Sequence, residues 1–443
     1  MPPPTTPPDT SASPWLPAAD AAALLGVQRG SLYSYVSRGL LRAQRVPGQR
    51  GSVYLQADVQ RLARQRHAVR NPRQLAQATL DWGQPVLTSA ITLVQSGALY
   101  YRGQPALQLA DTCSLEDVAA LLWQQKWPVA HATSARAATK PIAKDTPTAP
   151  RSAGQALASW YGAHADTDND ADAATGTHAP SSALQLGALL LLMCDVLCGA
   201  TVQPLASYAN ALSKNESSTA IHLRLAQYWH LNADNASTLR RALVLCADHE
   251  LNASSFAVRV AASTGASLHA CVGTGLATLS GPLHGGMTAV IRQHWEAWHT
   301  APAAVLAPSL AQLLSATRQG LTPNYCAGFG HPLYPQGDPR SHHLLQHLPP
   351  CPARSQLLQA VYTGTGLHPS LDYALVATER SLHLPPGAAF VLFALGRTAG
   401  WLAHALEQRA SGQLIRPRAQ YTGPAPATDL PAPQVPGRVV RFT

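Results

Sequence analysis

Two histidines set among glycines are the first residues in this sequence that could do chemistry. His284 lies in LSGPLHGGMT (residues 279–288), and His331 lies in GFGHPLYPQGDPRS (residues 328–341). Glycine lets a backbone pass close to another group, and an imidazole can carry or release a proton near neutral pH. Taken alone, each histidine is more often structural than catalytic, since the chain contains 18 histidines.

Charged residues in or near apolar runs add to these histidines. Asp372 stands in SLDYAL, Arg397 in FVLFALGRTAGW, and Arg416 and Arg418 in IRPRAQYTG. Asp372 could be a helix cap, and Arg397 could be a buried ion-pair partner. Because buried charges are costly unless paired, a set with more arginines than acids predicts an anionic ligand. A dicarboxylate held by bidentate arginine hydrogen bonds fits this description.

The elements that must position these residues are predicted to be mostly helices. The chain has 443 residues, 46% of them hydrophobic, which is enough for two or three domains with a large interior. Alanine and leucine dominate, and strand-forming aromatic residues are few. The longest apolar run, Leu186 to Cys194, is too short to cross a bilayer and predicts a buried helix.

Cysteines and the N-terminus predict a cytoplasmic protein without a metal site. The seven cysteines have no paired metal-ligand spacing, so Cys194 and Cys198 are expected to be reduced and buried. MPPPTTPPDT has neither a basic start nor an apolar stretch, so no signal peptide and no membrane association are expected.

Composition divides the chain into parts. Residues 1–13 are rich in Pro, Thr and Ser and are predicted to be a disordered leader, and residues 14–70 form a small basic module. The main helical domain is expected over 75–430, followed by a tail over 431–443. Within it, a segment at about 131–182, rich in Ala, Thr, Pro and Asp, is predicted to be a mobile low-complexity insertion.

The basic module has the pattern of a helix-turn-helix. A helix is expected from Pro17, a turn at Gly26–Val27, a second helix from Ser31, two short strands around PGQRGS, and a last helix near 56–66. Residues 1–70 carry a net charge of +6, two thirds of the excess of +9 for the whole chain. Such a module can place its second helix in a DNA major groove, whereas the alternative is a small helical cap with solvated arginines.

The stretch AALLGVQRGSLYSYVSRGLL…SVYLQADVQRL resembles the winged helix-turn-helix of MerR-like and excisionase proteins. This resemblance implies binding of double-stranded DNA, as a dimer. The residues expected to face DNA lie on the second helix and the wing, and they are Arg29, Ser31, Tyr33, Ser34, Arg38, Arg42, Arg45 and Arg50.

A second resemblance covers about residues 80–425 apart from the insertion. The stretch Leu93–Trp123, the segment CADHELNASSF…GPLHGG, the segment GFGHPLYPQGDPRS, and SLDYAL through IRPRAQYTG follow one another as in citrate synthases and 2-methylcitrate synthases. The family resemblance implies a mainly α-helical fold with a large and a small domain, and an obligate homodimer. It implies condensation of an acyl-CoA with oxaloacetate, hydrolysis of the thioester, and no metal or tightly bound cofactor.

The resemblance also implies a role for each matching position. Asp372 matches the general base, His284 the group that stabilises the enol of the thioester, and His331 the group that polarises and protonates the keto oxygen. The positions matching substrate-binding residues are His249, Arg340 and Arg397, together with Arg416, which reaches the neighbouring subunit's site.

The sequence departs from the family pattern at three places. Met287, Thr288 and Ala289 follow GPLHGG where a small residue, Asn and Glu are usual. Pro332 follows the second histidine where many members carry Arg, and Cys246 stands where His often precedes ADHE. These changes leave His284, His331 and Asp372 themselves intact.

Two functions remain open from the sequence. One is an enzyme that makes citrate or 2-methylcitrate from acetyl-CoA or propionyl-CoA, with an attached DNA-binding module. The alternative is a transcription regulator that uses the citrate synthase fold as a metabolite sensor with little turnover. The intact histidines and aspartate favour the enzyme, while the basic module and the altered turn favour the regulator. A purely structural helical dimer would leave the histidines and arginines without a role.

Overall fold

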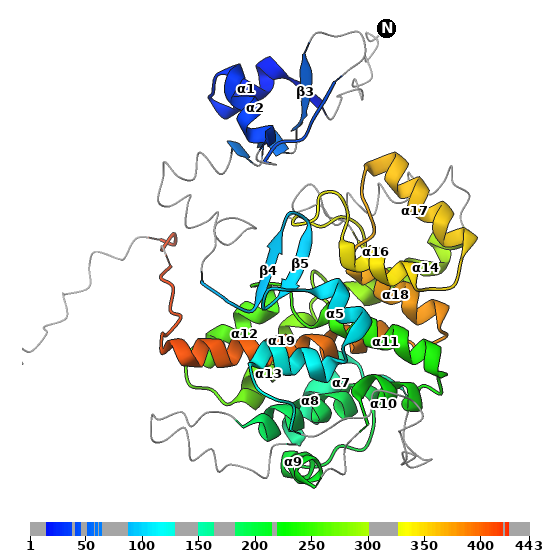
Figure 1. Ribbon diagram of the computed structural model, residues 1–443. Helices are drawn as coiled ribbons and strands as arrows, with labels where there is room; N and C mark the ends of the chain where they lie inside the picture. Colours follow the sequence, from blue (N-terminus) through cyan, green and yellow to red (C-terminus); the bar gives the residue numbers. More distant parts are fainter. Residues whose placement is uncertain are drawn as a thin grey trace, which may run out of the picture.

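The computed structural model describes residues 15–37, 40–45, 51–56, 58–60, 62–63, 87–128, 149–163, 182–214, 219–300, 327–419 and 421–424. Figure 1 shows a small N-terminal unit of helices and strands and a large body made chiefly of helices. The predicted leader (1–13), the tail (431–443), Arg38 and Arg50 all lie outside the described residues.

The N-terminal unit contains two short helices and a three-stranded antiparallel sheet. Its elements are β1 (Trp15–Pro17), α1 (Ala18–Leu25), α2 (Arg29–Ser37), β2 (Ala43–Arg45) and β3 (Ser52–Leu55), with strand order β1-β3-β2. Gly26 has a left-handed φ of 60° and ends α1, as the sequence predicts. Leu25, Leu32 and Tyr54 are buried between helices and sheet. The two helices, the turn and the hairpin are confirmed, whereas β1 is an element that the sequence analysis missed.

The large body begins with a small sheet and continues with helices. Its strands are β4 (Thr92–Gln95), β5 (Ala98–Tyr101) and β6 (Gln104–Pro105). Its helices are α5 (Ala106–Thr112), α6 (Leu115–Trp123), α7 (Ala153–Gly162), α8 (Ala183–Cys198), α9 (Leu205–Ser213), α10 (Ile221–Tyr228), α11 (Ala233–Cys246), α12 (Ala253–Ser263), α13 (Leu268–Leu279), α14 (Met287–Thr300), α16 (Pro339–Gln346), α17 (Pro352–Thr365), α18 (Leu371–Ser381) and α19 (Ala388–Ser411).

The sheet corrects the expectation of helices throughout this region. Gly97 and Gly103 adopt positive φ values of 77° and 81° in the two turns, which permits the antiparallel order β4-β5-β6. Side chains of β5 alternate in burial, and Leu99 and Tyr101 point inward. The Tyr101 hydroxyl lies 3.0 Å from the Val244 carbonyl oxygen, to which it donates. This small sheet therefore supports the C-terminal end of α11.

Helix α7 corrects the predicted insertion at about 131–182. Ser152 begins the helix with a capping box, in which its side chain and that of Gln155 bond each other's backbone N–H groups. Trp160 is fully buried, its ring centre lies 4.4 Å from that of His269, and its Nε1 donates to the His269 carbonyl oxygen. Helix α7 thus packs on the core through the buried Ala156 and Trp160, and residues 131–148 and 164–181 of the predicted insertion lie outside the described residues.

Helix α8 confirms the buried helix expected around Leu186 to Cys194. Every residue from Leu186 to Cys198 is buried, and its one charge, Asp195, forms an ion pair of 2.8 Å with Arg224. Each cysteine within the described residues is free, and Cys194 and Cys198 are buried as predicted.

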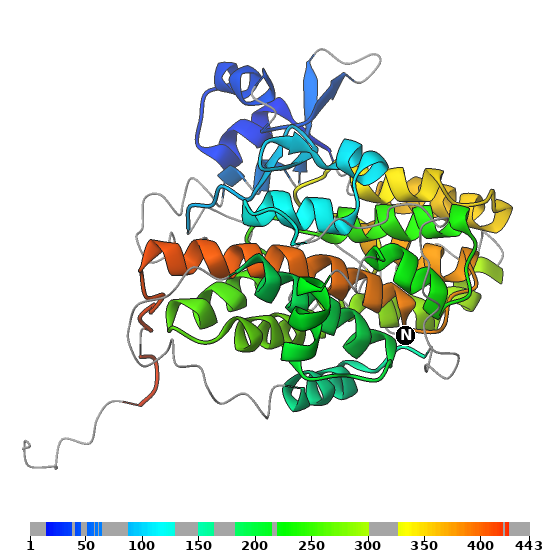
Figure 2. The same ribbon diagram turned by 60° about the horizontal axis from the view of Figure 1, so that its bottom comes forward.

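Helix α19 forms the centre of the body (Figure 2). It is long and apolar enough to cross a membrane, but 89% of its apolar window is buried inside the protein, as in a core helix. A Cβ at Gly396 would lie 2.5 Å from the Leu243 carbonyl oxygen, and one at Gly400 would lie 2.3 Å from that of Ala247. These glycines let α19 pack backbone to backbone against the end of α11, which places Arg397 beside residues 246–249.

Candidate active site

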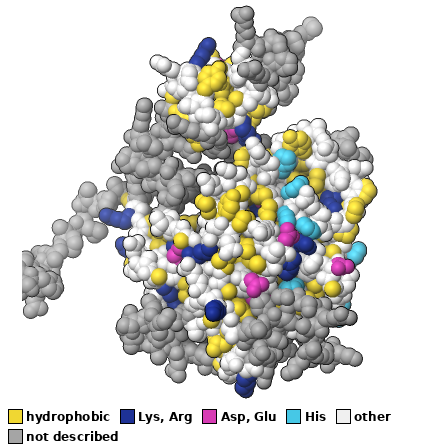
Figure 3. Space-filling model, viewed as in Figure 1, with side chains coloured by type: hydrophobic (Ala, Val, Ile, Leu, Met, Phe, Trp, Pro, Cys, Tyr) yellow, Lys and Arg dark blue, Asp and Glu magenta, His cyan; other side chains and the backbone are white. Residues whose placement is uncertain are grey.

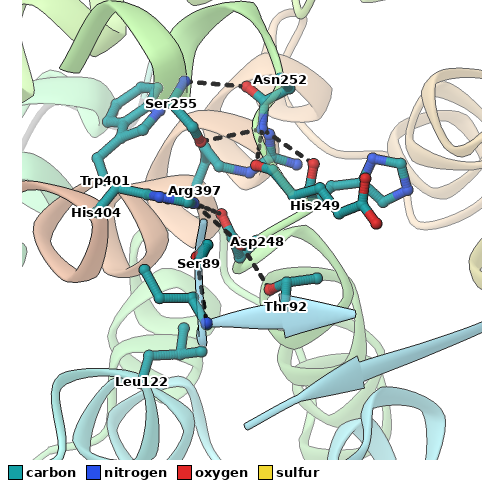
Figure 4. Close-up of polar contacts among 12 residues, drawn as sticks. Ser89, Thr92, Leu122, Asp248, His249, Asn252, Ser255, Arg397, Trp401 and His404 are labelled. Atoms are coloured by element: carbon teal, nitrogen blue, oxygen red, sulfur yellow. Dashed lines mark hydrogen bonds and ion pairs between the residues drawn. The ribbon is translucent and has the colours of Figure 1, made fainter. Parts of the chain in front are cut away.

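The loop after α11, residues 246–252, lies at the centre of the candidate site (Figure 4). Arg397 donates from Nε to the Cys246 carbonyl oxygen over 2.8 Å. The buried Asp248 carboxylate accepts from the Thr92 hydroxyl at 2.6 Å and from His404 Nε2 at 3.3 Å. A strand, the loop and α19 are therefore joined at one buried carboxylate. The sequence analysis singled out neither Asp248 nor His404.

His404 is held in one tautomer by its neighbour on the other side. Arg259 donates from Nε to His404 Nδ1 over 2.9 Å, so the hydrogen of the neutral ring is on Nε2 and points at Asp248. Arg259 is also paired with Glu407, whose other oxygen accepts from the Ala90 backbone N–H. These contacts support the loop that carries His249.

His249 is buried and lies close to His331. The two ring centres are 4.9 Å apart, and His249 Nε2 lies 2.9 Å from the Tyr334 hydroxyl oxygen. Burial and the nearby charge of Arg340 lower the pKa of His249 well below its ordinary value, so this imidazole is neutral at pH 7. The structure thus brings together two histidines that are 82 positions apart in the sequence.

The glycine turn that carries His284 folds back on its own helix. The backbone N–H of Gly286 donates to the carbonyl oxygens of Leu279 (3.0 Å) and Gly281 (3.1 Å) at the end of α13. A Cβ at Gly286 would lie 2.3 Å from the Ser280 carbonyl oxygen. These glycines are needed for packing against the protein's own backbone, and they present His284 at the start of α14. Thr288 fits this turn, because its hydroxyl donates to the Gly285 carbonyl oxygen.

Ser254 orients the imidazole of His284. Its hydroxyl oxygen lies 2.9 Å from His284 Nε2, and it accepts from Trp401 Nε1 at 3.1 Å. The ring centres of His284 and Phe393 are 5.9 Å apart, and the Arg397 guanidinium lies 5.0 Å from the centre of the same Phe393 ring. Burial, with a smaller contribution from Arg397, lowers the pKa of His284 to about 3. The imidazole is neutral at physiological pH.

His331 also has a defined tautomer. The backbone N–H of Leu333 donates to His331 Nδ1 over 3.2 Å, so the hydrogen of the neutral ring is on Nε2. Burial lowers the pKa of His331 to about 4, although the Asp338 carboxylate opposes this effect. His331 can therefore donate a hydrogen bond from Nε2 without carrying a positive charge.

Arg340 is bound to a neighbour that the sequence analysis did not name as a partner. Asp338 is the N-cap of α16, and its two oxygens accept from Arg340 Nε at 3.0 Å and Nη2 at 2.7 Å. Both side chains are buried, and the guanidinium lies 5.4 Å from the centre of the Tyr334 ring. Part of the guanidinium is used by this internal ion pair, which neutralises its charge.

Arg397 is buried without a carboxylate partner among the described residues. Its exposed fraction is 1%, and the hydrogen bond found for it within those residues is the one from Nε to Cys246. The sequence analysis gave a buried ion pair as an alternative role for Arg397, and the described part of the chain contains no such pair. An unneutralised buried guanidinium suits an anionic ligand.

Asp372 lies in the first turn of α18, two residues after the N-cap Ser370. Its Oδ1 is buried and has no hydrogen-bond partner among the described residues, and its Oδ2 lies 3.4 Å from the Ser370 hydroxyl oxygen. Burial raises the pKa of Asp372 to about 6, although Arg340 opposes this rise. A buried carboxylate that is poorly hydrogen-bonded and titrates near neutral pH has the properties of a proton acceptor.

These groups share one electrostatic environment. Arg397, Arg340, Asp372 and Asp338 all act on the pKa of the buried Cys246 thiol, which burial raises to about 12. His284 and His331 both act on the pKa of His249. Direct contacts join Arg397 to Cys246 and His331 to His249, and the charges of Asp372 and His284 act on the same two loop residues. The supporting residues Tyr334 and Ser254 were missed, because no local pattern distinguishes them from other polar residues.

The remaining predicted residues lie elsewhere. Arg416 is exposed beyond the end of α19, away from the site of its own chain. On the N-terminal unit, Arg29 and Tyr33 are exposed on α2, Ser31 and Ser34 are half-buried, and Arg45 lies in β2. Arg42 makes a bidentate pair with the buried Asp58, over 2.8 and 3.2 Å, which gives it a structural role that the sequence analysis did not predict.

Comparison with known proteins identifies the family. The model of the citrate synthase C-terminal domain matches residues 79–418. The chain belongs to the citrate synthase family. The match leaves out the N-terminal unit, whose helix-turn-helix assignment stays a prediction.

Individual members of the family agree with this match. Citrate synthase 2 of Bacillus subtilis is 34% identical over 42% of this chain, which spans about half the length of that relative. Citrate synthase of Mycolicibacterium smegmatis is 27% identical over 77% of this chain and 94% of its own. The citrate synthase of Thermoplasma acidophilum, solved as a ternary complex with carboxymethyl coenzyme A and oxaloacetate, has a TM-score of 0.52 at 20% identity. The structural alignment covers 80% of this chain and 97% of the Thermoplasma acidophilum chain, and this similarity shows the fold.

Proposed function

We propose that this chain condenses acetyl-CoA or propionyl-CoA with oxaloacetate and hydrolyses the thioester to give citrate or 2-methylcitrate and CoA. Asp372 carries this proposal, because it is a buried carboxylate with an unpartnered oxygen, and its charge acts on the pKa of Cys246, the residue whose carbonyl oxygen accepts from Arg397. Members of the family take a CoA thioester as substrate and need no tightly bound cofactor. The reaction therefore rests on side chains alone.

The first step is removal of a proton from the carbon next to the thioester carbonyl. Asp372 accepts this proton, and its raised pKa makes it a stronger base than an ordinary aspartate. The electron pair moves to the thioester oxygen as the enolate forms. In the structure the Ser254 hydroxyl donates to Asn252 Oδ1 over 2.7 Å, and the same hydroxyl oxygen lies 2.9 Å from His284 Nε2. Rotation of the Ser254 hydroxyl hydrogen from Asn252 to His284 Nε2 would place the ring hydrogen on Nδ1, from which His284 donates a hydrogen bond to the thioester oxygen.

The second step joins the two substrates. The enolate carbon attacks the keto carbon of oxaloacetate, and the keto oxygen takes up the proton from His331 Nε2, the nitrogen that carries hydrogen in the observed tautomer, which leaves His331 as an imidazolate. Arg397 and the free edge of Arg340 bind the carboxylates of oxaloacetate, and His249 adds a hydrogen bond. Water then cleaves the thioester, which releases the product carboxylate and CoA as a free thiol, and proton exchange with solvent returns Asp372 to a carboxylate and His331 to a neutral imidazole.

The proposal includes a homodimer in the cytoplasm. Arg416 is exposed at the end of α19, where it is free to reach a neighbouring subunit's site. In that arrangement each site would take one arginine from the other chain, so a monomer would bind oxaloacetate more weakly.

Release of thiol from purified protein tests this function. The assay mixes acetyl-CoA or propionyl-CoA with oxaloacetate and follows the free thiol with a colorimetric reagent. We expect release that requires oxaloacetate, and the faster acyl-CoA identifies the preferred substrate. The control omits oxaloacetate and reports simple thioester hydrolysis. No oxaloacetate-dependent release with either acyl-CoA would contradict the proposal and favour the sensor.

DNA binding by the N-terminal unit is a second proposal. The observation that favours it is the exposed surface of α2, where Tyr33 is 68% exposed beside the exposed Arg29. An aromatic and a guanidinium on the second helix of such a pair suit contacts with base edges and phosphates. The two proposals are compatible, since a symmetric dimer would present two copies of this unit to double-stranded DNA.

A further inference from the structure

A cluster of one aspartate and two histidines lies on the surface, outside the site described above. Asp111 belongs to α5, His343 lies in α16, and His347 is the C-cap of α16. Their ligand atoms all lie within 4.8 Å of one another. Figure 3 shows histidine, acidic and basic side chains side by side on the face of the body that Figure 1 presents. The sequence analysis predicted no metal site, because Asp111 is 232 positions away from His343.

The distances suit a divalent ion that prefers nitrogen ligands. His343 Nε2 lies 3.1 Å and His347 Nε2 lies 4.0 Å from Asp111 Oδ1. Ligand atoms bound tetrahedrally to Zn²⁺ at about 2.0–2.1 Å lie roughly 3.3 Å from each other. Small side-chain rotations would therefore bring all three atoms into range.

Neighbouring groups already orient two of the three ligands. His347 Nδ1 lies 2.8 Å from the His343 carbonyl oxygen, and since a carbonyl only accepts, the hydrogen of the neutral ring is on Nδ1. His347 Nε2 therefore carries the lone pair that binds a metal. Arg240 donates from Nη2 to the Asp111 carbonyl oxygen at 2.8 Å, which holds the backbone of the third ligand. Such contacts are the usual support of a metal ligand.

One basic side chain competes for the same carboxylate. Arg241 donates from Nε to Asp111 Oδ1 over 2.8 Å. Each carboxylate oxygen has two lone pairs, so Asp111 Oδ1 can keep this hydrogen bond and offer an ion the lone pair that now faces His343 Nε2. The side chains of Asp111, His343 and His347 are 39%, 15% and 32% exposed, so an ion can reach them from solvent.

We infer that Asp111, His343 and His347 form a binding site for a divalent transition-metal ion of the Zn²⁺ class, with water completing the coordination. The ion would replace the hydrogen bond between His343 and Asp111, with the His343 proton on Nδ1. Two imidazoles and one carboxylate favour Zn²⁺ over Mg²⁺, which prefers oxygen ligands. This inference does not rest on the proposed function.

The position of the ligands gives the ion a structural consequence. Helix α16 starts at the Asp338–Arg340 pair of the candidate active site, and α5 follows the small sheet that supports α11. A bound ion would tie α16 to α5 in addition to their packing contacts. It would therefore restrain any movement of Arg340 relative to His249.

Isothermal titration calorimetry of the full-length protein with ZnCl₂, after removal of metals with a chelator, tests the site. We expect one tightly bound Zn²⁺ for each chain, and binding at least about tenfold weaker in the His343→Ala/His347→Ala double variant. Zn²⁺ should also raise the melting temperature of the wild type and not that of the double variant. MgCl₂ should produce neither effect.

His342→Ala is the matched control, because His342 lies on the same helix but contacts Gln346 and not the cluster. We expect this variant to bind Zn²⁺ as the wild type does. If the double variant does not fold, His347→Ala alone serves, since His347 is partly exposed at the end of the helix. Equal affinity in the wild type and the ligand variant, or an equal loss in His342→Ala, overturns the inference.

Discussion

The pH dependence of turnover follows from the environment of Asp372. Burial raises the pKa of this carboxyl from 3.8 to about 6, which corresponds to about 3 kcal/mol against the ionised form at about 1.4 kcal/mol per pH unit. A base must be ionised to accept a proton. We therefore expect kcat/KM for the condensation to fall tenfold per pH unit below about pH 6 and to level off above it.

Two substitutions separate Asp372 from other titrating groups. Asp372→Asn removes the base and keeps the shape of the side chain, so we expect turnover to fall by about 10²–10⁴-fold. The decrease of kcat/KM below about pH 6, which we call the acid limb, should disappear in this variant. Ser370→Ala removes the hydroxyl that lies 3.4 Å from Asp372 Oδ2. Loss of this long hydrogen bond should move the limb upward by less than about one pH unit, because such a bond stabilises the carboxylate by roughly 1 kcal/mol or less.

The assay is thiol release from acetyl-CoA and oxaloacetate, measured from pH 5 to pH 8 in buffers of constant ionic strength. His284 and His331 titrate at about 3 and about 4, so neither produces a limb near pH 6. Glu296→Gln is the control, because Glu296 is an exposed carboxylate paired with Arg380. Turnover of Asp372→Asn within tenfold of the wild type, or an unchanged limb in that variant, would refute the reasoning.

Three further predictions concern packing, stability and DNA. Gly400→Ala would place a methyl group 2.3 Å from the carbonyl oxygen of Ala247, the C-cap of α11. This substitution should lower the free energy of unfolding in urea by at least about 1–3 kcal/mol. Gly154→Ala is the control, because a Cβ at Gly154 on α7 meets open space, and it should change the free energy of unfolding by less than about 1 kcal/mol. Because the pKa values of His284 and His331 are lowered in the folded protein, the unfolded chain binds more protons between about pH 4 and 6.5, and the free energy of unfolding should rise with pH in that window. His331→Gln should reduce this slope. An unchanged slope would contradict a lowered pKa for His331. Deletion of residues 1–70 should abolish salt-sensitive retention on double-stranded DNA and leave thiol release intact, and DNA retention by the truncated chain would rule out the N-terminal unit as the reader.

Local patterns in the sequence predicted much of the fold. The helix α8, the turn at Gly26 and the two helices beside it each depend on residues a few positions apart, so short-range periodicity and a single glycine are enough to indicate them. Local composition also predicted a mobile insertion at about 131–182, and this prediction was wrong for the residues that form α7. Trp160 was overlooked because its burial depends on His269, more than a hundred positions away.

The candidate site was predicted as a set of residues and not as a geometry. Motifs named His284, His331, Asp372 and Arg397. The structure places Arg397 and His331 in contact with the loop 246–249, and His284 and Asp372 act on the pKa of groups in that loop. No motif indicated the internal partner of Arg340 or the serine that orients His284. Hydrogen-bond partners in this site come from different helices, and their pairing is set by how α11, α16 and α19 pack.

By itself the sequence determined the helical class, the family and the identities of the reactive side chains, because these follow from composition and from motifs written in contiguous residues. Only the tertiary structure decided which charges are compensated. It pairs Arg340 with Asp338, leaves Arg397 without a carboxylate among the described residues, and joins Asp111 to two histidines of α16. The pKa of a group and its affinity for an ion depend on desolvation and on charges a few ångströms away in space, and distance along the chain does not fix either one.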